Sequence, residues 1–161
     1  MAIFVFMQTQ DVLLKFATIL EYLSLLDSSK AILSLQYNQE LVRLLEKFWS
    51  TEKIFEHLGV GVDSTLRDTP QLWAGVLFFI KTPHTRELIN TFYDLAITHP
   101  TLFTDIHNEY KRHPGFIENR HDQSILSILR KQAGTEVVIM PPTGFGDTDI
   151  SLPIRGTRIR D

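Results

Sequence analysis

The hydrophobic residues of this chain fall into short continuous runs separated by stretches with helical spacing. Three short runs, at residues 2–6, 31–36 and 136–141, are rich in aliphatic, β-branched or aromatic side chains and predict buried strands. The longest run, LWAGVLFFIKT at 72–82, is almost entirely apolar, which predicts a strand buried on both faces of a sheet.

Between these strands, apolar residues recur every three or four positions, which is typical of amphipathic helices. The predicted helices span about 12–26, 38–49, 83–100 and 121–133, and a shorter one lies between a Ser50 or Thr51 cap and Gly59. The residues expected to face inward are Leu88, Ile89, Phe92, Leu95 and Ala96 in the third helix and Ile125, Leu126, Ile128 and Leu129 in the fourth. Strands that alternate with helices predict an α/β fold, a mixed sheet with flanking helices.

Length and composition fit one domain over residues 1–161, with an irregular tail at 141–161 that is rich in Gly, Pro and Asp. The net charge is −3, which gives no general attraction to nucleic acid, so we expect no nucleic-acid partner. The chain has no cysteine, which excludes thiol catalysis, zinc–thiolate sites and disulfides.

The first residues do not have the pattern of a targeting segment. No positive charge precedes Lys15, and Gln8, Gln10 and Asp11 interrupt the first apolar run. Neither a secretory signal nor a membrane-spanning helix is therefore expected. We expect a cytoplasmic protein, and attachment to a membrane surface remains compatible with the sequence.

Three polar residues, His121, Asp122 and Gln123, stand where the helix at 121–133 is predicted to begin. A helix N-terminus has free N–H groups and a partial positive charge, which favour an ionised carboxylate. Helix capping alone explains an aspartate at this place, so the residues by themselves leave a structural and a functional interpretation open.

The surrounding run, ENRHDQSILSIL at 118–129, resembles a group of bacterial and viral nucleotide-sugar glycosyltransferases with the GT-A fold. In that group a His-Asp-Gln triplet opens a helix. The resemblance covers roughly residues 20–161, and its most specific parts are ENRHDQS and the terminal TRIR. It implies the C-terminal portion of a GT-A-like fold and the transfer of a sugar from a nucleotide-sugar to a hydroxyl of a glycan or polysaccharide acceptor.

The resemblance also implies roles for the triplet. Asp122 is the expected catalytic residue, because a carboxylate can hold sugar hydroxyls or accept the proton of the acceptor hydroxyl. Gln123 suits hydroxyl recognition, and His121 can donate to a diphosphate or ligate a metal. The expected ligands are a nucleotide-sugar donor, a glycan acceptor and a divalent metal ion, Mn²⁺ or Mg²⁺.

Two features of the tail bear on phosphate and metal binding. Arg158 and Arg160 are candidates for contacting the donor phosphates, although a solvated basic tail is the commoner fate of such residues. Asp147 and Asp149 have the spacing of the Asp-x-Asp metal motif of GT-A enzymes, but they follow the His-Asp-Gln helix and stand among glycines, which favours a turn. The other histidines have no metal-ligand spacing.

Members of the resembling group begin with a further nucleotide-binding segment that has no counterpart here. We therefore expect an incomplete GT-A-like domain, which would need a separate N-terminal half or a homo-oligomer partner for full activity. The alternative function is a non-catalytic α/β binding or assembly module that keeps the same scaffold.

Overall fold

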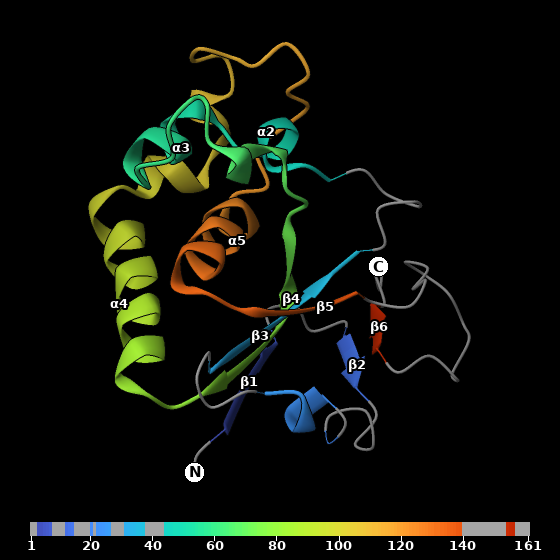
Figure 1. Ribbon diagram of the computed structural model, residues 1–161. Coiled ribbons are helices and arrows are strands. Elements are labelled where there is room, and N and C mark those ends of the chain that lie inside the picture. The colour runs from blue at the N-terminus through green and yellow to red at the C-terminus, as the bar shows by residue number, and fades with distance from the viewer. Residues whose placement is uncertain are drawn as a thin grey trace, which may run out of the picture.

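A four-stranded mixed sheet forms the centre of the molecule, as the computed structural model shows (Figure 1). The structure describes residues 3–7, 12–14, 20, 22–26, 31–37, 44–139 and 154–156. The strand order is β1 (Ile3–Met7), β4 (Leu72–Ile80), β3 (Ile32–Gln36) and β5 (Glu136–Ile139). β4 is antiparallel to both β1 and β3, whereas β5 is parallel to β3. A separate antiparallel pair joins β2 (Val12–Leu14) to β6 (Ile154–Gly156).

Helices cover one face of this sheet. They are α2 (Glu46–Trp49), α3 (Glu52–His57), α4 (Pro83–Thr98) and α5 (Asp122–Ala133), with 3₁₀ turns at Thr65–Asp68, Pro100–Phe103 and Asp105–His107. Leu88 of α4 and Leu126 of α5 pack with Leu77 and Phe79 of β4 on this face. Tyr22, from a helical segment at 22–24, packs against the opposite face.

β4 is buried along all nine of its residues, as its apolar sequence predicts. The alternation of its side chains between the two faces of the sheet shifts by one residue at Gly75. Trp73, Val76 and Phe78 pack on one face, and residues 74, 77 and 79 pack on the other. The pairing with β3 is irregular over the same stretch. The Trp73 indole lies across Gly75, where an added Cβ would stand 2.4 Å from a ring carbon, so only glycine fits there.

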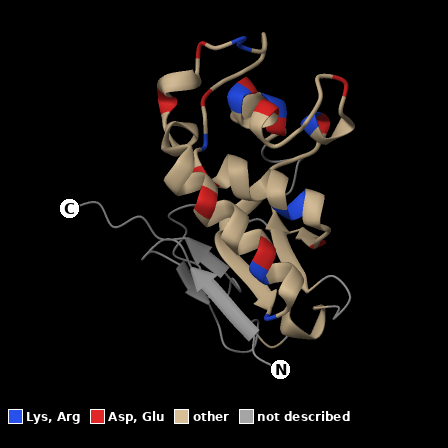
Figure 2. Cartoon of the chain, turned by 90° about the vertical axis from the view of Figure 1, so that its left-hand side faces the viewer, with Lys and Arg blue, Asp and Glu red and all other residues tan. Residues whose placement is uncertain are grey.

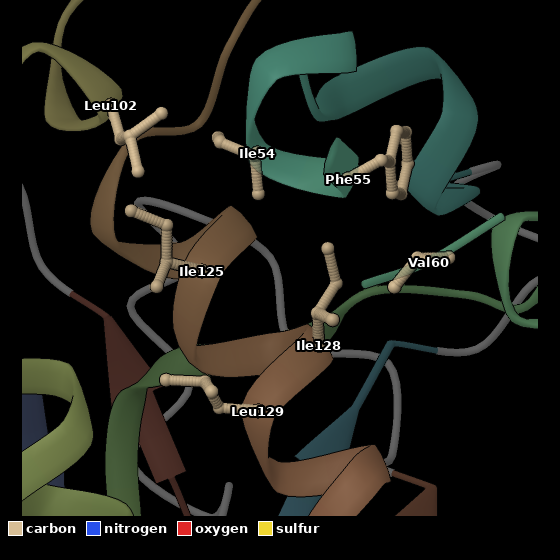
Figure 3. Packing of buried hydrophobic residues seen from close by; sticks show 7 residues of the cluster. All are labelled: Ile54, Phe55, Val60, Leu102, Ile125, Ile128 and Leu129. Atoms are coloured by element: carbon tan, nitrogen blue, oxygen red, sulfur yellow. The ribbon is translucent and has the colours of Figure 1, made fainter. Parts of the chain in front are cut away.

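α5 is the most enclosed helix. Three of its apolar residues, Ile125, Ile128 and Leu129, pack against Ile54 and Phe55 of α3 in a second cluster (Figure 3). Val60 and Leu102 complete this cluster. Gly134, with a φ of 83°, ends the helix as predicted.

The predicted α/β fold with a mixed sheet and flanking helices is confirmed at this level, and so are the four strands and the limits of α3, α4 and α5. Two predicted helices, 12–26 and 38–49, differ from the structure where it describes them, and residues 15–19, 21 and 38–43 lie outside the described residues. Residues 12–14 form a strand, and Leu45 is extended and bridges Pro70, so that α2 starts only at Glu46. Pairing with a distant segment outweighed local helical spacing in both places.

Two further expectations were wrong in detail. Ile89 of α4 is 41% exposed rather than inward, because the helix packs mainly through Thr85 and Leu88. The tail predicted to be irregular contains β6, which pairs with β2. Among the described residues, no helix combines the length and the apolar character needed to cross a bilayer.

Candidate functional site

The predicted triplet lies at one end of the sheet, where β3 ends and β4 begins. The side-chain amide of Gln123 contacts the beginning of β4: its Nε2 donates to Oε1 of Gln71, just before the strand, at 3.0 Å, and its Oε1 accepts from the backbone N–H of Ala74, within the strand, at 3.5 Å. On the other side of the sheet end, Tyr37 follows β3 and its ring lies 6.0 Å from that of Trp73. Tyr37 and Trp73 belong to the cluster on the sheet face opposite to α5.

His121 precedes α5 in a backbone conformation that is rare for a residue with a side chain. Its φ of 50° and ψ of −117° belong to a region that glycine adopts readily. Two contacts hold it there: its N–H donates to Asn119 Oδ1 at 3.1 Å, and its Nε2 lies 3.0 Å from Asp105 Oδ1. The buried Asn119 is itself fixed, because its Nδ2 donates to the carbonyls of Leu102 and Thr104.

Asp122 is the first residue of α5 and is partly buried. Burial raises the pKa of its carboxyl, while hydrogen bonds from its own N–H and that of Gln123 lower it to a smaller extent, with a further lowering by His121. The sequence predicted that the helix start would favour the ionised carboxylate. The structure corrects this, because desolvation raises the pKa by more than the N–H groups of the helix start lower it. A carboxyl with a raised pKa is better suited to accepting a proton than an ordinary aspartate.

Beside the triplet, Arg120 is stacked on Trp49. Its guanidinium lies 4.5 Å from the centre of the indole ring, and its backbone N–H donates to Trp49 O at 3.1 Å and to Ser124 Oγ at 3.1 Å. Tyr37 is close enough for the Arg120 charge to lower its pKa, but burial dominates and raises that pKa to about 12. Nothing in the sequence reveals that Trp49 lies under Arg120.

A buried polar network supports this end of α5 from below. Glu46 of α2 is fully buried and accepts hydrogen bonds from Ser50, Ser127 and Lys131. Burial lowers the pKa of Lys131, and the Glu46 carboxylate partly offsets this. The neighbouring Gln71 is also fully buried, and its Nε2 lies within hydrogen-bonding distance of Trp49 O and of the hydroxyls of Ser50 and Ser124.

Arg130, one helical turn beyond Ser127, links α5 to the sheet. Its guanidinium is fully buried and donates to Ser34 Oγ and to the carbonyls of Leu72 and Trp73, each at 3.1 Å. Burial lowers its pKa to about 9, which still leaves it charged at neutral pH. The amphipathic spacing of α5 predicted only its apolar residues to face inward. The sequence of the helix therefore did not indicate that its polar residues form a buried network.

The described residues contain no group of three or more His, Asp or Glu side chains that could hold a metal ion. Asp147, Asp149, Arg158 and Arg160 lie outside the described residues, so their predicted metal and phosphate roles stay predictions. Charged side chains in the described part are interleaved in sign (Figure 2).

Comparisons with known proteins add nothing to these assignments. No family model, no curated protein sequence and no solved structure matches the chain. The resemblance to GT-A glycosyltransferases therefore stays a prediction that rests on the sequence motifs.

Proposed function

We propose that this chain is a GT-A-type glycosyltransferase or the C-terminal part of one. It transfers a sugar from a nucleotide-sugar to a hydroxyl of a glycan or polysaccharide acceptor, in the cytoplasm. The observation that carries the proposal is the position of Asp122, a partly buried carboxyl with a raised pKa that begins α5 at the end of the sheet where β3 ends and β4 begins. Ligands of open α/β sheets bind beyond the carboxyl ends of parallel strands, and the parallel strands β3 and β5 both end here.

Within this proposal Asp122 contacts the sugar or accepts the proton of the attacking hydroxyl. His121 supports the assignment through its backbone, because a side-chain-bearing residue held at a φ of 50° stores strain of about 1–3 kcal/mol. Such strain is concentrated at functional sites. Gln123 contacts a hydroxyl of the sugar or acceptor, and its hydrogen bonds with Gln71 and Ala74 orient the start of α5.

The donor side of the reaction is part of the same proposal. Arg158 and Arg160 would contact the donor phosphates, and Mn²⁺ or Mg²⁺ would neutralise the leaving diphosphate. A separate nucleotide-binding half or a second copy of the chain would complete the donor site. His121 is the candidate ligand for such a metal, and its Nε2 lies 3.0 Å from Asp105 Oδ1.

A non-catalytic binding or assembly module is the second candidate function, and two observations favour it. The side chains of His121 and Gln123 are engaged in hydrogen bonds within the protein. In addition, α4 exposes Ile89, Tyr93 and Ile97, which recur every fourth residue on its outer face. A module of this kind would bind a partner chain and would not turn over a nucleotide-sugar.

Isothermal titration calorimetry of the full chain with a panel of nucleotide-sugars and Mn²⁺ separates the two functions. A transferase binds at least one donor and releases free nucleotide when an acceptor glycan is added. Asp122→Asn is expected to abolish release, whereas Asp94→Asn, an exposed residue of α4, is the matched control and leaves release unchanged. Absence of donor binding by the wild-type chain would exclude autonomous transfer.

A further inference from the structure

A half-open cavity lies between α4 and the sheet, toward the C-terminal end of β4, whereas the His-Asp-Gln triplet lies at the N-terminal end of that strand. Its volume is about 370 Å³, within the range of about 300–1,000 Å³ that is typical of small-molecule sites. Ile89, which was predicted to face inward, borders the opening and is 41% exposed. The apolar lining comes from three elements and consists of Leu77, Phe79, Ile89, Phe92 and Leu126.

The interior of this cavity is apolar. Among the described residues that line it, Thr85 is the one uncharged polar residue, and its hydroxyl donates to the carbonyl of Ile80 at 2.7 Å. The lining therefore offers water few hydrogen-bonding partners inside the cavity. A cavity of this kind favours an apolar ligand over ordered water.

Two exposed cations, Lys81 and Arg86, border the opening. Lys81 directly follows β4, and Arg86 belongs to the N-terminal part of α4. In the part of the chain that the structure describes, neither side chain has an ion pair or a hydrogen bond, whereas Lys53 and Lys111 both pair with Glu56. The two charges at the opening are therefore available to an anionic group of a ligand.

The acidic residues of α4 do not cancel these charges at the cavity. Glu87 and Asp94 line a separate polar groove on another flank of the helix, and neither of them lines the apolar cavity. Arg86 borders both the groove and the cavity. The charged residues that line the apolar cavity are thus both positive, which complements an anion and not a cation.

We propose that this cavity binds a fatty acid, with the aliphatic chain inside and the carboxylate at Lys81 and Arg86. The guanidinium of Arg86 has paired N–H donors that suit the two oxygens of a carboxylate, and the ammonium of Lys81 adds a second positive charge. A cavity of about 370 Å³ takes one aliphatic chain and not the two chains of a bilayer phospholipid. The site is separate from Asp122, so the proposal goes beyond the proposed transferase function and does not depend on it.

Isothermal titration calorimetry of the full chain with decanoate, octanoate, decanol and decyl phosphate tests the proposal. We expect one decanoate to bind per chain. Octanoate, which is two methylene groups shorter, is expected to bind about fifteenfold more weakly, because it buries less apolar surface. Decanol is expected to bind about five- to tenfold more weakly than decanoate, because it lacks the charge that the two exposed cations attract.

Two pairs of variants assign the parts of the ligand. Lys81→Gln combined with Arg86→Gln is expected to reduce the affinity for decanoate to that for decanol, whereas Lys111→Gln with Arg112→Gln, at two exposed cations of the loop before α5, leaves it unchanged. Ile89→Trp fills the cavity and is expected to weaken both ligands at least tenfold. Its control is Ile97→Trp, at an exposed position of the same helix that does not line the cavity.

Equal affinities of the wild-type chain for decanoate and decanol would overturn the proposal, and so would binding of several decanoate ions that Ile89→Trp does not change. Tighter binding of decyl phosphate than of decanoate would also overturn it, by assigning the cavity to a phosphate-bearing lipid. The comparison of ligands on the wild-type chain decides the matter even if a variant does not fold. Since the probes contain neither nucleotide nor metal, absence of donor binding would count against the transferase function and leave this result unaffected.

Discussion

Lys131→Met gives the sharpest test of the buried network. The Lys131 ammonium donates to Glu46 Oε1 at 2.5 Å, to Thr69 Oγ1 at 2.8 Å and to Pro70 O at 2.7 Å. Methionine keeps most of the side-chain volume but removes the charge and all three hydrogen bonds. It leaves the fully buried Glu46 carboxylate with only hydroxyl donors from Ser50 and Ser127.

Breaking a buried ion pair from one side costs about 3–5 kcal/mol of unfolding free energy. We expect the lower end of this range, about 3 kcal/mol, because the charge of Arg130 continues to interact with Glu46. Urea unfolding followed by circular dichroism at neutral pH measures the change. With a denaturant slope of about 1–3 kcal/mol/M, the midpoint is expected to fall by about 1 M or more.

Two controls make the result interpretable. Lys47→Met breaks the pair with Asp68, whose side chain is 62% exposed, and is expected to change the unfolding free energy by less than about 1 kcal/mol. Glu46→Gln combined with Lys131→Met removes both buried charges and is expected to recover most of the loss. Equal effects of the two lysine variants would refute the reasoning. A double variant as unstable as Lys131→Met would assign the loss to Thr69 and Pro70 instead.

Three further predictions concern the strained and crowded positions of the sheet end. Gly75→Ala is expected to destabilise the protein by about 1–3 kcal/mol, because the new methyl group displaces the Trp73 ring. Near-ultraviolet circular dichroism should show the altered indole environment. An unchanged spectrum and an unchanged urea midpoint would contradict this prediction. His121→Gly is expected to be about 1 kcal/mol more stable than His121→Ala in urea, since glycine adopts a φ of 50° without strain, and the reverse order would show that the backbone there is relaxed. Because the pKa of Asp122 is raised, its carboxyl binds a proton more tightly in the folded state than in the unfolded chain. The contribution of Asp122 to the unfolding free energy therefore falls as pH rises from about 3.8 through the folded-state pKa. Asp122→Asn should remove that fall when stability is measured across the same pH range, and an unchanged pH profile would contradict the assignment.

The parts of the fold that the sequence predicts best are those whose signals are local. The nine apolar residues of β4, the Thr51 cap of α3 and Gly134 after α5 each specify their structure within a few neighbouring positions. The position of the triplet at the start of α5 was predictable for the same reason. Its side-chain environment was not, because Asn119 and Asp105 are brought there by the loop that precedes it.

The remainder depends on contacts between segments far apart in the chain. Ser124, Ser127 and Arg130 read as the polar face of an amphipathic helix, yet all three are fully buried. Their partners come from α2 and from the two neighbouring strands, so burial follows from tertiary contacts rather than helical period. The contact between Arg120 and Trp49 was unpredictable in the same way, since Trp49 lies 71 positions earlier in the sequence.

The parallel pairing of β5 with β3 has a consequence for the order in which the protein forms during synthesis. The side chain of Thr135, the residue before β5, donates to the carbonyl of Ile32 across a separation of 103 residues. At a ribosomal rate of about 5–20 residues per second, β3 waits roughly 5–20 s for this partner to be made. Until then one edge of β3 lacks its partner strand β5, and the wholly apolar β4 lacks the cover of α5. An unpaired strand edge of this kind can pair with other chains. The nascent chain is therefore expected to depend on chaperones most strongly just before α5 emerges, and the sheet end that carries Asp122 is among the last parts to assemble.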